Sequence, residues 1–282
     1  MLTPTPALRT ASAGLALAVL SACAPSNASD APDASDTAEE PATVVVGVHS
    51  GLPSLGYAEG SGPRGFEVDV ARYVAERVAG PDARIEFRGV LPPERDTVVR
   101  DGEVDMLFAT YSALPERGEF VTFGGPYVTA SQDTVVRAED TSIDAREDLA
   151  GTRVCKVEGS NSWRRITDDE GIDVELVDAA DYPECLDMLV EGELDVVSTD
   201  DLVLAGIIPD GESDAYRFVN DPFTEERYSV ALPKGDVETC QLVNEAIEEM
   251  YADGTALRLL EEWFGSTNLS LDRPLPEAET CV

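Results

Sequence analysis

The chain is organised around one stretch, Ala109-Thr110-Tyr111-Ser112-Ala113-Leu114-Pro115-Glu116-Arg117. It follows an apolar run, 104–108, that predicts a buried strand, so the stretch forms the loop at the carboxyl end of that strand, where open α/β sheets bind ligands. The planar guanidinium of Arg117 matches a carboxylate, and Ser112 adds a hydroxyl and a backbone N–H. These residue types predict one half of an amino-acid site. The alternative is that Arg117 is an ordinary surface arginine.

A second loop supplies the chemistry that the other half of such a site needs. Ser198-Thr199-Asp200-Asp201 follows another apolar strand, 194–197, in a similar strand-loop-helix context. A carboxylate there suits an ammonium group, and Asp200 is the candidate. The alternative role for Asp200 is the N-cap of the helix that follows.

Composition excludes several classes of function. The chain has 282 residues, of which 43% are hydrophobic, enough for one large domain or two lobes with their own cores. Its 56 Asp and Glu against 20 Lys and Arg give a formal net charge of -36. Such a surface repels nucleic acids and anionic lipid headgroups, so we expect no nucleic-acid partner.

The N-terminus has the features of an export signal. An apolar run, 11–20, is too short to span a bilayer but suits the core of a lipoprotein signal peptide over residues 1–22. It ends in Leu20-Ser21-Ala22-Cys23, which resembles the bacterial lipobox, so we expect Cys23 to be acylated. The protein would then contact the membrane only through this lipid anchor. Residues 23–42 are rich in Ala, Ser, Asp, Glu and Pro and predict a flexible acidic tether.

Four cysteines follow the anchor, an even number in an exported chain. This favours two disulfides over metal ligation or a catalytic thiol. We expect Cys155 to pair with Cys185 and Cys240 with Cys281, which is one of three possible connectivities.

From residue 43 onward, strands and helices are expected to alternate, which predicts an α/β fold of mainly parallel sheets flanked by helices. Two extended crossings, 131–138 and 226–233, would join two lobes and return the last helical region, 237–260, to the first lobe. Lobe I is expected over 43–131 and 232–265, lobe II over 132–231, and a C-terminal tail over 266–282. The expected strands are 43–48, 84–87, 104–109, 133–137, 153–157, 174–177 and 194–198, and the expected helices are 66–79, 95–100, 163–169, 182–191 and one starting at 201.

The loop Glu158-Gly159-Ser160-Asn161-Ser162 joins one of these strands to a helix. Ser160 or Ser162 can cap that helix, and the free N–H groups of its first turn would suit an anion. A capped helix without a ligand is the plainer alternative. We expect Lys156, on the preceding strand, to face away from the ligand.

Residues 43–265 resemble the family 3 extracellular solute-binding proteins of polar amino-acid ABC importers, and most closely the glutamate-binding lipoproteins of actinobacteria. The resemblance implies a type II periplasmic-binding-protein fold. It rests on the order and spacing of several sequence motifs. These are Gly65-Phe66-Glu67-Val68-Asp69-Val70, Gly102-Glu103-Val104-Asp105, Tyr111 to Arg117 running into Phe123-Gly124-Gly125-Pro126-Tyr127, Asp195 to Asp201, Thr199 to Gly206, Pro222 to Glu226, and Leu232-Pro233-Lys234-Gly235.

The resemblance also implies residue roles at the two ends of a bound amino acid. Arg117 would bind the α-carboxylate, helped by Ser112 and by N–H groups around Ser160 and Asn161. The ammonium would be bound by three groups: the carboxylate of Asp200, the carbonyl of Thr110 and the hydroxyl of Ser112.

The resemblance places two cations near the distal end of the ligand. Arg95 stands where acidic-amino-acid binders of the family carry an arginine, and His49 follows the first strand at a position that is often cationic. Two cations would favour L-glutamate or aspartate over glutamine, because an unpaired anion in a closed cleft is costly. Pro92 departs from the pattern, standing where related binders have a serine. His49 is the one histidine of the sequence and has a plainer alternative as a filler at the strand end.

Taken together, we expect an extracytoplasmic monomer that captures L-glutamate or a related polar amino acid for the permease subunits of an ABC importer. A single histidine makes triads and metal sites poor candidates, so we expect no metal and no cofactor. The alternatives are an enzyme of the same fold, of the dehydratase type, and a glutamine- or aspartate-binding sensor lipoprotein.

Overall fold

The first sheet contains a run of valines in β1 (Thr43–His49), one of its inner strands. The structure is a computed structural model that describes residues 42–58, 62–208, 213–267 and 269–282. The sheet has the strand order β4 (Arg84–Val90), β1 (Thr43–His49), β5 (Met106–Phe108), β12 (Glu226–Pro233) and β6 (Val121–Ala130). β1 is parallel to β4 and β5, while β12 is antiparallel to β5 and β6. Val46 and Val48 are fully buried in β1, as expected for β-branched residues in a strand covered on both faces.

The second sheet is mixed. Three of its strands are β10 (Val197–Asp200), β7 (Gln132–Arg137) and β11 (Tyr216–Phe218), and β7 is antiparallel to both neighbours. Beside them, β8 (Arg153–Val157) and β9 (Glu175–Ala179) form a two-stranded parallel pair. A parallel bridge between Val154 and Val196 attaches β8 to the segment that enters β10.

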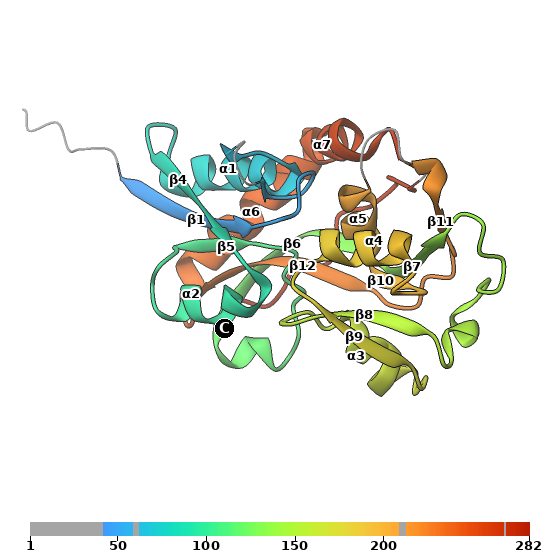
Figure 1. Cartoon of the computed structure of the whole chain (residues 1–282). Coiled ribbons are helices and arrows are strands. Elements are labelled where there is room, and N and C mark those ends of the chain that lie inside the picture. The colour runs from blue at the N-terminus through green and yellow to red at the C-terminus, as the bar shows by residue number, and fades with distance from the viewer. Residues whose placement is uncertain (1–41, 59–61, 209–212, 268) are drawn as a thin grey trace, which may run out of the picture. The chain divides into compact units, whose positions relative to one another are not determined.

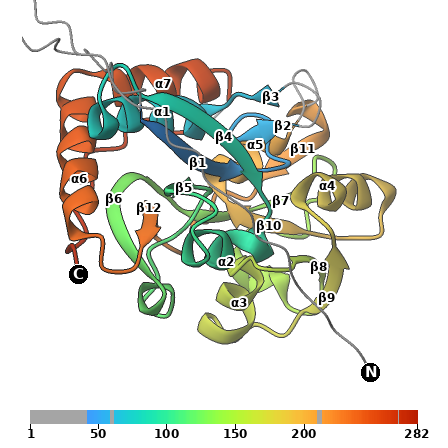
Figure 2. The ribbon, with the colours of Figure 1, turned by 90° about the vertical axis from the view of Figure 1, so that its left-hand side faces the viewer.

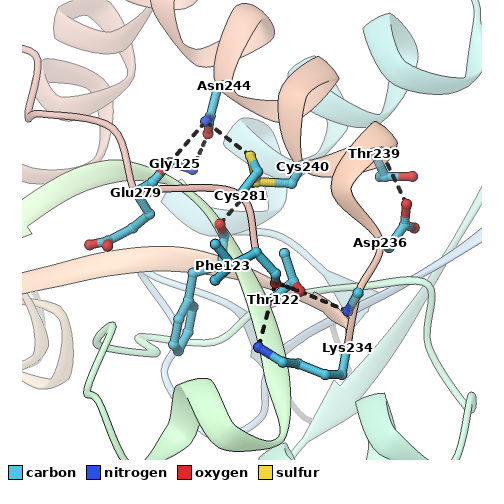
Figure 3. The surroundings of a disulfide bond; sticks show 12 residues. Thr122, Phe123, Gly125, Lys234, Asp236, Thr239, Cys240, Asn244, Glu279 and Cys281 are labelled. Atoms are coloured by element: carbon cyan, nitrogen blue, oxygen red, sulfur yellow. Dashed lines mark hydrogen bonds between the residues drawn. A yellow bond between two sulfur atoms is a disulfide. The ribbon is translucent and has the colours of Figure 1, made fainter.

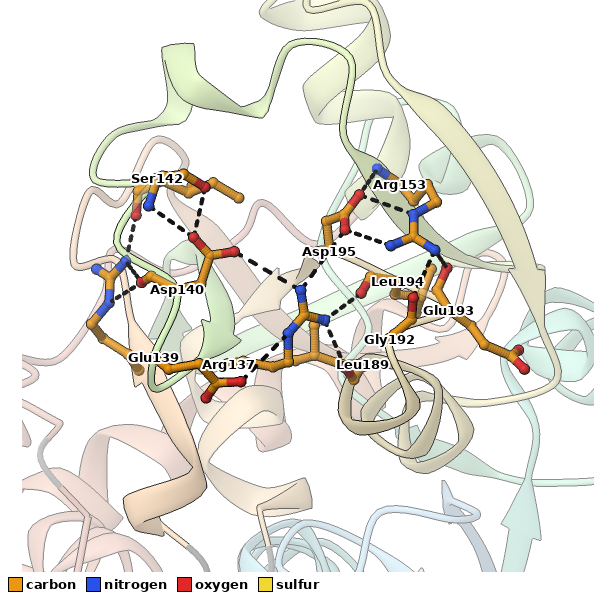
Figure 4. Close-up of polar contacts among 12 residues, drawn as sticks. Arg137, Glu139, Asp140, Ser142, Arg153, Leu189, Gly192, Glu193, Leu194 and Asp195 are labelled. Atoms are coloured by element: carbon orange, nitrogen blue, oxygen red, sulfur yellow. Dashed lines mark hydrogen bonds and ion pairs between the residues drawn. The ribbon is translucent and has the colours of Figure 1, made fainter.

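Arginines fasten the outer edge of this second sheet (Figure 4). Arg153 forms an ion pair of 2.6 Å with Asp195 and also donates to the carbonyls of Gly192 and Glu193. Arg137 donates to the carbonyls of Leu189 and Leu194, at 2.8 and 2.7 Å. These bonds hold β7 and β8 to the turn that precedes β10.

The two sheets are joined by β6 and β12, which run side by side between them (Figure 1). The expectation of a crossing at 131–138 is wrong, because β7 is paired inside the second sheet with β10 and β11. Residues 226–231, expected in lobe II, pair with β6 and β5 of the first sheet. Residues 40–282 form one compact unit, and the lobe boundaries themselves stay a prediction.

Helices cover both sheets. In α1, Phe66, Val70 and Val74 are buried at the helical spacing that the sequence predicts. Figure 2 shows α1, α6 and α7 beside the first sheet. The helices are α1 (Phe66–Ala79), α2 (Arg95–Arg100), α3 (Ser162–Arg164), α4 (Tyr182–Glu191), α5 (Asp201–Ile207), α6 (Val237–Ala252) and α7 (Thr255–Phe264); the short helices are η1 (Pro92–Glu94), η2 (Arg117–Glu119), η3 (Arg146–Leu149), η4 (Arg165–Asp169) and η5 (Ser213–Ala215), and a small hairpin pairs β2 (Tyr57–Ala58) with β3 (Gly62–Pro63).

Both predicted disulfides are confirmed. Cys155 of β8 is bonded to Cys185 of α4, and Cys240 of α6 is bonded to Cys281 of the tail, with Cα atoms 5.9 and 5.8 Å apart. Among the helices of the described residues, none has the length and apolar character needed to cross a bilayer. The signal peptide, Cys23 and nearly all of the tether lie outside the described residues.

Candidate functional site

Arg117, Ser160 and Asn161 line one cavity of about 770 Å³. Arg117 comes from the loop that follows β5, and the two polar residues come from the loop that follows β8. The structure therefore brings together three residues that the sequence assigns to one site. The other lining residues are Asp96, Leu114, Glu116, Lys156, Glu158, Gly159, Trp163, Arg164, Asp178 and Ala179.

Arg117 is oriented by its own loop. Its Nη1 donates to the carbonyl of Ser112 at 3.0 Å, and its guanidinium carbon lies 4.3 Å from the centre of the Tyr111 ring. The Tyr111 hydroxyl is in turn bonded to Asp96. Stacking on an aromatic face holds the guanidinium plane without using its remaining donors.

The loop after β8 is more internally bonded than the sequence predicts. The Ser160 N–H donates to the carbonyl of Val157 at 3.2 Å, and Ser160 Oγ accepts from the Ser162 N–H and lies 2.6 Å from the Tyr182 hydroxyl. Ser160 thus bonds the turn before α3 but does not cap the helix as expected, and its own N–H is engaged. Asn161 is the N-cap residue of α3 and makes no side-chain cap bond.

Thr110 is held by a buried acid that the sequence analysis did not single out. Its φ of 45° is unusual for a residue with a branched side chain, and its N–H donates to Glu67 Oε1 at 2.6 Å. Glu67 also accepts from the Tyr127 hydroxyl. Burial raises the pKa of Glu67 to about 7. The sequence signal for Glu67 is an acid between Phe66 and Val68, at the start of a helix whose other buried residues are apolar.

Arg95 does not present a free guanidinium. It is only 4% exposed, and its donors are directed at four backbone carbonyls, at 2.7 to 3.2 Å, which belong to Pro92, Ala109, Thr110 and Gly159. The Thr110 carbonyl, expected to accept from a ligand ammonium, accepts here from Arg95. Instead of facing a distal ligand group, Arg95 joins the loop after β5 to the loop after β8.

His49 ends β1 and is buried, and its Nδ1 has no hydrogen-bond partner within the described part of the chain. Burial, and then the positive charge of Arg95, lower the pKa of His49 to about 3. The side chain is therefore neutral near pH 7, which corrects the expectation of a cation at this position.

Asp200 is directed at β12. It is 8% exposed, and its Oδ2 accepts from the Tyr228 hydroxyl at 2.5 Å. It occupies the N-cap position of α5 but makes no side-chain cap bond, so the plainer alternative does not describe its side chain. Burial, and then the nearby charge of Glu226, raise the pKa of Asp200 to about 7. Tyr228 also faces Ser112 in an antiparallel bridge, which places the Asp200 partner beside the loop that carries Arg117.

The sequence of the chain is also similar to those of known proteins. The model of the bacterial extracellular solute-binding proteins, family 3, matches residues 44–266. The chain belongs to this family.

Individual proteins are also similar to this chain. Glutamate-binding protein GluB of Corynebacterium glutamicum is 36% identical over 274 residues, covering 93% of this chain and 91% of GluB. An ancestral arginine-binding protein solved with bound glutamine is 30% identical, with a TM-score of 0.69, and covers 79% of this chain and 98% of its own. AncCDT-1, an ancestral amino acid-binding protein described as a precursor of cyclohexadienyl dehydratase, is 26% identical with a TM-score of 0.68, covering 79% and 95%. The two-lobe, type II fold expected for family 3 is confirmed.

One cation on the cavity wall was set aside by the sequence analysis. Lys156 was expected to face away from the ligand, but it lines the cavity and pairs with Asp178 at 2.9 Å. Its Nζ lies 5.5 Å from the centre of the Trp163 ring, which Arg164 also contacts at 4.9 Å. β8 pairs with β9 close to the cavity. Strand alternation predicts the face of β8 from which Lys156 extends, but it does not predict where the end of this long side chain lies.

Proposed function

We propose that this family 3 protein captures glutamate, or a related polar amino acid, and delivers it to the permease subunits of an ABC importer. The observation that carries the proposal is the position of Arg117 on the same cavity as Ser160 and Asn161, which come from the other sheet. The 36% identity to a glutamate-binding protein over most of both chains supports glutamate as the ligand.

The proposed binding chemistry uses opposite charges at the two ends of the amino acid. The α-carboxylate would accept from the Arg117 fork, with Ser112 and the Ser160–Asn161 turn beside it. The ammonium would bind to Asp200, next to the Thr110 loop. An affinity in the micromolar range requires about -8 kcal/mol, which a bidentate arginine pair and a bonded ammonium can supply.

The distal carboxylate of glutamate needs a different partner from the one that the sequence predicts. Arg95 is bonded to carbonyls and His49 is neutral, so in this proposal Arg95 acts by shaping the Thr110 loop and His49 fills the buried end of β1. Besides Arg117, the cations that line the cavity are Lys156 and Arg164. These two are the proposed source of positive charge for an acidic ligand.

Transport would follow from closure of the two lobes around the ligand. An amino acid bound to one lobe recruits the polar groups of the other and shifts the population to a closed form, which the permease recognises. Acylation of Cys23 would keep the monomer at the outer face of the membrane, with residues 23–42 as its tether.

The direct test is calorimetry of the chain with each of the twenty amino acids. The expected result is saturable binding of glutamate, with weaker binding of glutamine and aspartate. A chain that binds no amino acid would contradict the proposal, and consumption of a cyclohexadienyl acid, followed by NMR, would favour the dehydratase alternative. For the anchor, Cys23→Ala should move the protein from the membrane fraction to the medium.

A further inference from the structure

The C-terminal tail follows a defined path across the strands that join the two sheets. Residues 269–282 follow α7, and the last residues lie beside β6, β12 and the start of α6 (Figure 3). We call residues 269–282 the C-terminal clasp.

One end of the clasp is fixed to the first sheet and its helices. The Cys240–Cys281 disulfide bonds it to α6, and the Glu279 N–H donates to the carbonyl of Gly125 in β6 at 2.6 Å. Arg227 of β12 forms an ion pair of 3.0 Å with Glu279 and donates to the Glu277 carbonyl at 2.5 Å. The clasp therefore holds both joining strands at once.

Arg273 connects the clasp to the other sheet. Its Nη2 lies 2.7 Å from Asp201 Oδ2 at the start of α5, and its Nη1 donates to the carbonyl of Thr129 in β6 at 2.5 Å. The two side chains are only 10% and 16% exposed. A partly buried pair of this kind is screened less than a surface pair, so removing one partner has a larger effect.

Asp201 in turn holds the point at which the chain passes from β6 into β7. Its Oδ1 accepts from the N–H groups of Leu202 and Ser131, at 2.7 and 3.3 Å, and its own N–H donates to the Ser131 carbonyl at 2.9 Å. Asp201 is also the neighbour of Asp200. Through Thr129 and Asp201, Arg273 thus contacts the crossing from β6 into β7. It also contacts the turn that carries Asp200, the residue proposed to bind the ammonium.

We propose that Arg273 is a positioning residue for amino-acid binding, through which the clasp sets the arrangement of the crossing and of the Asp200–Asp201 turn. This inference rests on the proposed function. A contact that joins both sheets changes ligand affinity when it stabilises one arrangement of the sheets more than another. None of the clasp residues lines the cavity.

The test compares Arg273→Gln with the full chain by calorimetry and thermal unfolding. Arg273→Gln is expected to weaken glutamate binding about ten-fold, while Arg273→Lys, which keeps the charge, recovers part of the affinity. In a double-mutant cycle, Asp201→Asn should add little to Arg273→Gln, because both remove the same contact. The control is Arg258→Gln, whose ion pair with Glu262 is 62% and 57% exposed, and which should leave affinity unchanged.

A second measurement does not need a ligand. Hydrogen exchange at the amides of Ser131 and Leu202, both bonded to Asp201, should be faster in Arg273→Gln than in the full chain. If Arg273→Gln binds glutamate with unchanged affinity, with or without a lower melting temperature, the clasp only stabilises the fold. That result would overturn the inference. If the full chain binds no amino acid, the proposed function fails, and unchanged exchange at these two amides would then overturn the inference separately.

Discussion

The guanidinium of Arg95, the first residue of α2, donates a hydrogen bond of 2.7 Å to the carbonyl of Gly159 in the loop after β8. The same side chain donates to the carbonyl of Thr110 in the loop after β5. Arg95 therefore joins the two loops that carry Arg117 and Ser160, both of which line the cavity.

Arg95→Gln tests this role against the one that the sequence predicts. Loss of a buried charged donor to several carbonyls should lower the free energy of unfolding by about 3 kcal/mol. Affinities for glutamate and glutamine should fall by similar factors, because Arg95 shapes the loops and does not contact the distal group. Urea unfolding and calorimetry measure the two effects, with Arg100→Gln, at an exposed pair, as the control. A selective loss of glutamate binding would restore Arg95 as a ligand residue.

Gly159 offers a sharper test of the contact between the loops. Its φ is +77°, and an added Cβ would lie 2.7 Å from the backbone carbon of Pro92. Gly159→Ala should therefore push the loop after β8 away from η1 and Arg95 and weaken ligand binding at least ten-fold, since this arrangement needs that space.

The matched control for this substitution is Gly151→Ala. Gly151 has a φ of +76° but no atom within 4 Å of an added Cβ. Both variants carry a similar backbone strain of about 1 kcal/mol. Only Gly159→Ala should lose affinity in calorimetry, and equal affinities in the two variants would show that the loop contact plays no part in binding.

The pH dependence of binding should follow Asp200. Burial raises its pKa to about 7, so at lower pH the free protein holds a proton that an ammonium ligand must displace. Binding should be about ten-fold weaker at pH 6 than at pH 8, with proton release on binding. Because Glu67 also has a pKa of about 7, Asp200→Asn is the necessary control and should remove the trend. A rise in affinity as the pH falls would instead fit a cationic His49.

The disulfide between Cys155 and Cys185 should stabilise the fold without taking part in ligand binding. It closes a loop of 30 residues, which predicts about 4 kcal/mol from loop entropy. The double variant Cys155→Ser, Cys185→Ser should lose that much in urea unfolding. An unchanged urea midpoint would show that the bond adds nothing to the folded state.

Much of the fold and part of the site follow from local sequence. The periodicity around Phe66 and Val70 predicts a helix, and the even cysteine count predicts two disulfides, and the structure confirms both. The joining strand β6 was missed because Gly124, Gly125 and Pro126 suggest a loop, whereas pairing with β12 makes them a buried strand.

The rest of the site depends on tertiary contacts. No local pattern shows that Arg95 is directed at a carbonyl 64 residues away, or that burial beside Arg95 keeps His49 neutral. The same holds for Arg273, whose partner Asp201 is 72 residues distant in sequence.

In the proposed function, Arg117 and Asp200 bind opposite ends of one amino acid. Calorimetry of three ligands tests it most directly: glutamate, 4-aminobutyrate, which lacks the α-carboxylate, and glutarate, which lacks the ammonium. Arg117→Gln should abolish the preference for glutamate over 4-aminobutyrate and keep the preference over glutarate, while Asp200→Asn should do the reverse. If either variant weakens all three ligands by one common factor, or changes none of them, the claim is contradicted.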